Sequence, residues 1–175
     1  MSQHIVNLTV EDAYAKLKAQ LLAKGCKIVS EVPPNQLSVR QGSLWGVAPR
    51  TAKKTVNMTL EASEEKTLIK YSSKLTSDWK NITVIGCILA FILAAVCLWL
   101  ATDLGAFLNT GNPSFWRWLV SARGQVAFQA GEAFVNLAWG LAVFLFIIIA
   151  AEAIVYFYCG SRVETFATEV VGELA

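Results

Sequence analysis

Apolar side chains fill two long stretches of the chain. Residues 82–100 contain one threonine and two cysteines as their only polar groups, and residues 133–159 contain one asparagine and one glutamate as clearly polar side chains. About 20 apolar residues in a helix cross a hydrocarbon core of ~30 Å. The pattern therefore predicts two transmembrane helices, over 77–101 and 125–159, that form a hairpin.

In residues 1–76 the patterns of polar and apolar side chains are shorter. Polar and apolar side chains alternate along five stretches, which is typical of strands with one buried face. Between the first two stretches, apolar side chains recur at helical spacing over 10–24, behind a capping box at Thr9 and Asp12. The order β-α-β-β-β-β predicts an α+β head, one helix on a mostly antiparallel sheet, fused to the α-helical transmembrane hairpin. The strands are predicted over 5–10, 26–32, 36–41, 54–61 and 66–75.

The last residues, 160–175, predict an acidic amphipathic helix. A capping box at Ser161 and Glu164 opens it, and its apolar stripe comprises Val163, Phe166, Val170 and Leu174. One helix is too small to cover five strands, so the rest of the sheet must face this tail, a partner or the membrane surface. Residues 1–80 carry 12 Lys or Arg and 7 Asp or Glu. The opposite charge makes the tail the first candidate.

Composition and charge place the chain in a membrane. Of its 175 residues, 55% are hydrophobic and 16% are charged, against about 25% charged in a soluble domain. Lys70, Lys74 and Lys80 precede the first span, whereas the loop between the spans carries Arg117 and Arg123. The positive-inside rule then predicts a cell-membrane protein with two spans and cytoplasmic termini.

The loop 102–124 is predicted to be extracytoplasmic. Phe115, Trp116 and Trp118 surround Arg117, which is the composition of a short helix lying in the membrane interface. After it, polar residues recur on one helical face, so the second helix is expected to begin near residue 125. These residues, Gln125, Gln129, Glu132 and Asn136, would face water, another loop or a neighbouring subunit.

Residues 42–54 do not follow a regular pattern. They combine an apolar tip with basic residues, which is typical of a loop that touches anionic lipid headgroups. The alternative is a long connection whose tryptophan packs into the core of the head. The candidate membrane-surface residues are Leu44, Trp45, Arg50, Lys53 and Lys54.

The βαββββ head, the loop "GSLWGVAPRTAKKTV" and the segment "SSKLTSDW" before the first span resemble small prokaryotic membrane proteins, archaeal ones included. The resemblance covers roughly residues 1–100. Those proteins have no assigned activity, so the resemblance implies an architecture and no reaction.

Glu152 lies inside the second apolar stretch. A charged side chain at mid-bilayer costs roughly 2.5–3.5 kcal/mol on insertion scales, and less near the edge. One interpretation is a polar pin, in which Glu152 contacts Lys80 or Thr83 across the hairpin. A second is a protonated carboxyl that bonds a backbone carbonyl, and a third is a proton or cation site.

Small residues form a stripe on each predicted span. Such stripes allow helices to approach closely, within one chain or between chains. The candidates for helix packing are Gly86, Ala90 and Ala94 in the first span and Ala138 and Ala142 in the second.

Catalytic signatures are missing from the sequence. The single histidine is His4, and the four cysteines show no CxxC spacing. We therefore expect no enzymatic activity, no cofactor, no metal and no nucleic-acid partner. The bilayer is the expected partner, and two functions remain. The first is a structural or interaction protein that forms a homo-oligomer or docks on a larger membrane complex. The second is a lipid- or ligand-sensing or transport module.

Overall fold

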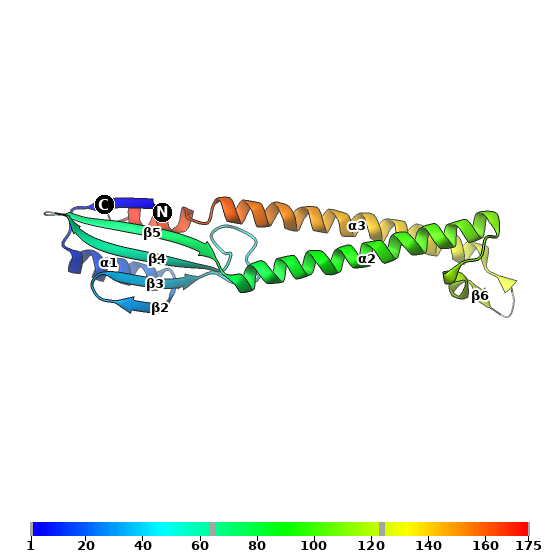
Figure 1. Cartoon of the computed structure of the whole chain (residues 1–175), viewed down its shortest axis with the longest axis horizontal. Helices are drawn as coiled ribbons and strands as arrows, with labels where there is room; N and C mark the ends of the chain where they lie inside the picture. The colour runs from blue at the N-terminus through cyan, green and yellow to red at the C-terminus, as the bar shows by residue number, and fades with distance from the viewer. Residues whose placement is uncertain (1, 64–65, 123–124, 175) are drawn as a thin grey trace. The chain divides into compact units, whose positions relative to one another are not determined.

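The computed structural model of the chain describes residues 2–63, 66–122 and 125–174 (Figure 1). The chain forms two compact units. The first, here called the head unit, comprises Met1–Thr83 and Ile154–Ala175, and the second, the helix-pair unit, comprises Val84–Ala153. Arg123, which entered the charge argument, lies outside the described residues.

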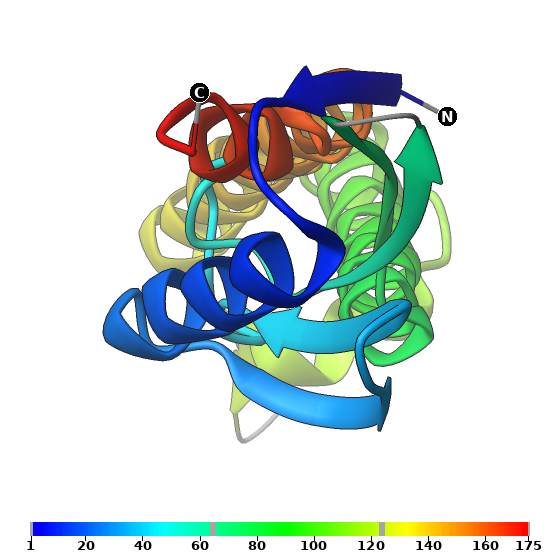
Figure 2. The same ribbon diagram turned by 90° about the vertical axis from the view of Figure 1, so that its left-hand side faces the viewer.

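The head unit is built on a five-stranded antiparallel sheet in the order β1-β5-β4-β3-β2. Figure 2 shows this sheet curving around two helices that lie on one of its faces. The sheet and its first helix match the α+β head expected from the sequence. The strands are β1 (Ser2–Val6), β2 (Lys27–Val32), β3 (Gln36–Gln41), β4 (Lys54–Ser63) and β5 (Lys66–Leu75).

The prediction for the first strand was wrong in its bounds. β1 ends at Val6, whereas the alternation predicted a strand over 5–10. The chain has to leave the sheet early because Thr9 is the N-cap of α1 (Val10–Ala23). Its side-chain oxygen accepts a hydrogen bond from the backbone N–H of Asp12 at 3.2 Å, as the capping box predicted. The helix stops before Gly25, whose φ of 75° suits glycine.

The core of the head lies between the sheet and its two helices. Alternate residues of β4 and β5 point inward, and the register places Met58 opposite Tyr71 and Leu60 opposite Ile69. On the helix side, Ala13, Leu17 and Leu21 of α1 are buried in the same cluster. This period of two on the strands and of three to four on the helix is what the sequence predicted.

The C-terminal tail completes that core, as its sequence predicted. The helix α4 (Thr165–Gly172) packs beside α1 and covers β5 and β1 (Figure 2). Two ion pairs join the tail to the rest of the head, Lys24–Glu173 at 2.7 Å and Arg50–Glu169 at 2.9 Å. Exposed pairs contribute about 0–1 kcal/mol each, so apolar burial dominates. The buried tail residues are Phe166, Ala167, Val170, Val171 and Leu174.

The capping box predicted for the tail is not formed. The preceding helix continues to Ser161, whose hydroxyl donates to the carbonyl oxygen of Tyr158. Glu164 is the N-cap of α4 but makes no capping hydrogen bond with its side chain. Its carboxylate instead accepts a hydrogen bond from the hydroxyl of Ser2 at 2.7 Å, which links the tail to β1.

Two helices are long and apolar enough to cross a membrane, α2 (Ser77–Thr110) and α3 (Phe128–Ser161). α2 runs nine residues beyond its predicted end at residue 101. Ala101 and Leu104 are buried, so packing continues past the length that a bilayer requires. The helix ends at Thr110, and Gly111, which follows it, has a φ of 72°.

The connection between the helices contains the expected short helix. The 3-10 helix η1 (Phe115–Leu119) is capped by Ser114, whose hydroxyl oxygen accepts from the backbone N–H of Trp116 at 3.1 Å. A two-stranded ribbon follows, formed by β6 (Ser121–Ala122) and β7 (Gln125–Val126). Gln125 is therefore in a strand, and only Gln129, Glu132 and Asn136 of the predicted polar face belong to α3.

Candidate functional site

The end of the head from which α2 and α3 leave is the first candidate site. Its centre is Trp79, which is 2% exposed and stacks on Tyr156 with ring centroids 6.1 Å apart. The indole N–H of Trp79 donates to the carbonyl oxygen of Gly46 at 3.0 Å. One side chain thus holds together the start of α2, the end of α3 and the loop 42–53. We call this the junction cluster, with Leu44, Ala52, Leu75, Trp79, Val155, Tyr156, Cys159 and Val163 as members.

The loop 42–53 is folded back on itself. A Cβ at Gly42 or Gly46 would collide with the backbone of Thr51 and Ala52, so both positions require glycine. Leu44 packs into the junction cluster, whereas Trp45 is 81% exposed and Val47 is 69% exposed. The structure contradicts the interpretation that Trp45 belongs to the core of the head.

The three basic residues proposed for a membrane surface all have protein partners. Lys54 is fully buried, and its ammonium donates to the carbonyl oxygens of Pro49 and Arg50. Lys53 pairs with Asp78 at 2.5 Å, and Arg50 pairs with Glu169. Lys54 is therefore inaccessible to a headgroup, because it shares the inward-facing register of Val56. Its burial lowers the pKa of Lys54 to about 8.

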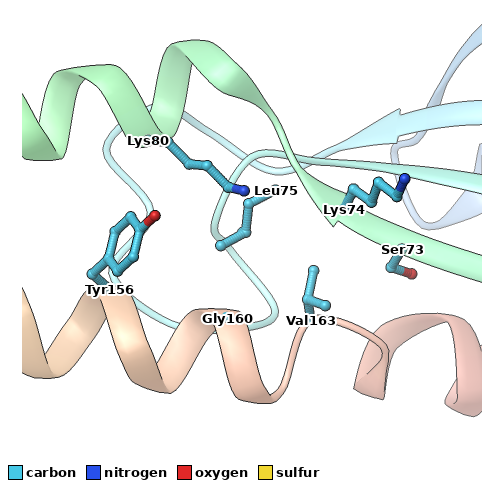
Figure 3. A pocket seen from close by; sticks show the side chains of 7 residues that line it. All are labelled: Ser73, Lys74, Leu75, Lys80, Tyr156, Gly160 and Val163. Atoms are coloured by element: carbon cyan, nitrogen blue, oxygen red, sulfur yellow. The ribbon is translucent and has the colours of Figure 1, made fainter.

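A pocket of about 210 Å³ opens beside the junction cluster (Figure 3). Figure 3 shows the side chains of Lys80 and Tyr156 projecting into the same space, above Gly160 and Val163, while the ammonium of Lys74 points away. The lining residues are Ser73, Lys74, Leu75, Lys80, Tyr156, Gly160 and Val163. We call this the junction pocket.

The second candidate site is Glu152 in the helix-pair unit. Its carboxylate lies over Gly86 of α2, where a Cβ would be 3.3 Å from Oε2. The thiol of Cys87 donates to the same oxygen at 3.2 Å. The hydroxyl of Thr83 is used elsewhere, since it donates to the carbonyl oxygen of Trp79 in its own helix. The structure thus gives Glu152 partners that differ from the two proposed from the sequence.

The small-residue stripes meet within one chain. Ala94 and Ala142 are fully buried between α2 and α3, together with Cys97 and Leu145, and Ala90 packs against them. Ala138 is 6% exposed. Of the two arrangements that the stripes allowed, the intramolecular one is present.

A polar centre that the sequence did not suggest lies at the far end of α2. The carboxylate of Asp103 accepts a hydrogen bond from the hydroxyl of Ser114 at 2.5 Å, which ties η1 to the helix. Trp99 packs there against Phe115 and Trp116, with ring centroids 5.2 and 5.1 Å apart. These contacts order the connection and offer no catalytic arrangement.

Among the residues that the structure describes, no group of three His, Cys, Asp or Glu side chains could hold a metal ion. No protein-family model matches the chain, and no curated protein matches it either.

We expect the head to become more stable as the pH rises through the titration of Lys54. The pKa of Lys54 is about 8 in the folded chain and 10.5 for an ordinary lysine. Between these values the unfolded chain holds a proton that the folded chain has lost, so the free energy of unfolding increases with pH. The gain is at most about 3–4 kcal/mol, at about 1.4 kcal/mol per pKa unit.

The measurement is denaturant unfolding of the full chain in detergent at pH 8 and 10.5, compared with Lys54→Met. The variant should lack the increase, and Lys53→Met, one residue away, should keep it. Parallel pH curves for the unmodified chain and Lys54→Met would contradict the assignment.

We expect Gly86→Val to destabilise the helix pair by about 1–3 kcal/mol, because its side chain would overlap the carboxylate of Glu152. Glu152→Ala in the same chain should recover part of this loss. Thermal unfolding in detergent measures both. Gly140→Val is the matched control, since a Cβ there meets nothing within 4 Å. If Glu152→Ala restores nothing, the packing of Glu152 over Gly86 does not limit stability.

Proposed function

We propose that the chain is a two-span membrane protein that acts as a structural or interaction protein, with its head as the docking module. The observation that carries this proposal is the exposure of α2 and α3. Only 17% and 11% of their most apolar windows are buried. A core helix of a soluble protein would be mostly buried, and exposed apolar surface on this scale favours lipid as the surrounding medium.

The arrangement of the termini supports a hairpin in the membrane. β1 and α4 belong to the same compact unit, although α2 and α3 separate them in the chain. Two crossings return the chain to the side on which it began, so both ends can build one head. Three lysines on the head side of α2 (Lys70, Lys74 and Lys80) favour the cytoplasm for that side.

The head has a free surface suited to docking. β2 is an edge strand, and Val29 and Val32 on it are 50% and 59% exposed. An edge strand offers unpaired backbone groups that a further strand can bind. We propose that a second copy of the chain or a subunit of a membrane complex occupies this edge.

The alternative function is a lipid- or ligand-sensing or transport module, and the junction pocket favours it. A transport function would rest on Glu152, whose carboxylate already packs on Gly86 and Cys87. We assign the chain no enzymatic reaction and no nucleic-acid partner.

Insertion and topology can be tested by labelling with a membrane-impermeant maleimide in intact cells. We expect Asn112→Cys, in the connection between the helices, to be labelled from outside. Lys66→Cys, in the head, should be labelled only after permeabilisation. The unmodified chain sets the background from its native cysteines. Release of the chain from carbonate-washed membranes would contradict insertion, and the opposite labelling pattern would invert the topology.

We expect Val29→Lys combined with Val32→Lys to reduce the mass of the detergent-solubilised particle, because charges on an edge strand block pairing with a further strand. Leu22→Lys is the control, since Leu22 is equally exposed but lies on α1. Native mass measurement gives the copy number. A monomeric unmodified chain would exclude self-association and leave a membrane complex as the docking partner.

A further inference from the structure

The junction pocket lies where lipid headgroups would be, if the chain spans the membrane as proposed above. Its walls come from the end of β5, the first turns of α2 and the last turns of α3 (Figure 3). These are the segments from which the two apolar helices leave the head. Tyrosines are enriched at this level of membrane proteins, and Tyr156 lines the pocket.

The polar groups of the pocket suit an anion attached to an apolar body. Lys80 supplies an ammonium and Tyr156 a phenolic hydroxyl, and Leu75 and Val163 supply apolar walls. Lysine binds phosphate as a point charge, and an ionised acceptor strengthens the hydrogen bond from a hydroxyl donor. The volume of about 210 Å³ is below the roughly 300–1,000 Å³ of sites for drug-sized ligands. The pocket is therefore smaller than a site for a drug-sized ligand and large enough for a phosphate group.

The charge of Lys80 remains available to a ligand. Within the described part of the chain, no carboxylate forms an ion pair with its ammonium. The nearest acidic residue in sequence, Asp78, is paired with Lys53, and Glu164 accepts a hydrogen bond from Ser2. Tyr156 is held in place because its ring stacks on the buried ring of Trp79.

We propose that the junction pocket binds the phosphate of an anionic lipid headgroup, with Lys80 as its counter-ion and Tyr156 as a hydrogen-bond donor. This inference rests on the proposed membrane insertion. Leu75 and Val163 line the head side of the pocket, so the glycerol and the acyl chains would leave it past Lys80 and Tyr156, on the side where α2 and α3 continue.

The experiment is native mass spectrometry of the full chain in detergent, titrated with phosphatidylglycerol and, separately, phosphatidylcholine. We expect the unmodified chain to prefer phosphatidylglycerol. Lys80→Met should weaken that binding by about fivefold or more, and Lys80→Arg should restore most of it. Tyr156→Phe keeps the stacked ring and should produce a smaller loss. Lys66→Met removes the same charge at the opposite end of β5 and should leave binding unchanged.

Each other result overturns the proposal in a distinct way. Equal losses for Lys80→Met and Lys66→Met would show diffuse attraction by the head and no pocket. Equal binding of the two lipids would exclude a phosphate site selective for anionic lipid. Displacement of lipid by millimolar glycerol phosphate would identify a soluble phosphate as the ligand. Release of the chain from carbonate-washed membranes would refute the proposed insertion. Lipid binding in detergent is a separate measurement, so the two failures can be distinguished.

Discussion

A five-stranded sheet with one apolar face needs more cover than α1 alone provides, and this constraint shapes the rest of the molecule. The missing cover is α4, which buries Phe166, Val170 and Val171 against β5 and β1. Burying a side chain of this size contributes about 1.5–3 kcal/mol, so the head cannot reach its full stability without its last residues. Because α4 follows α3 after a turn of three residues, the segment that completes the head comes after both long helices in the chain.

The same constraint explains why the head and the ends of the helices form one unit. Strand β5 leads through Thr76 directly into α2, and α3 leads directly into α4. Trp79 then fills the space between these two connections and binds the loop 42–53 through Gly46. At this point one buried indole of α2 joins two segments that are distant from it in sequence, the loop 42–53 and the end of α3.

Most of this fold could be predicted because strands and helices have different periods. β3, β5 and α1 lie close to their predicted ranges, and the buried residues are those that the alternation selected. β1 was misplaced because the alternation of Val6 and Leu8 continues into a segment that the N-cap of α1 uses. The length of α2 was underestimated because bilayer thickness sets a minimum for a spanning helix and no maximum. The sequence around residue 101 contains no local signal for the packing contacts that extend α2 beyond that residue.

The candidate sites were harder to predict, because in each of them residues close together in the sequence have different surroundings in the fold. Lys54 was grouped with Lys53 by composition, although its parity with Val56 and Met58 on β4 already indicated the buried face. Leu44 and Trp45 were treated as one tip, but only the smaller side chain packs inward. The partners of Glu152 depend on the axial register of α2 against α3. A shift of one helical turn between the two helices replaces Thr83 by Gly86 and Cys87 as the residues opposite Glu152.

The junction gives a physical route from the pocket to the surface of the head. Tyr156 lines the pocket and stacks on Trp79, and the indole of Trp79 in turn donates to the carbonyl oxygen of Gly46. Gly46 lies between Trp45 and Val47, the two most exposed apolar side chains of the loop. Lys54 and the Arg50–Glu169 pair hold the other side of this loop against α4. The loop is therefore held on one side by Trp79 and on the other by the head core, and its exposed tip lies between these two attachments.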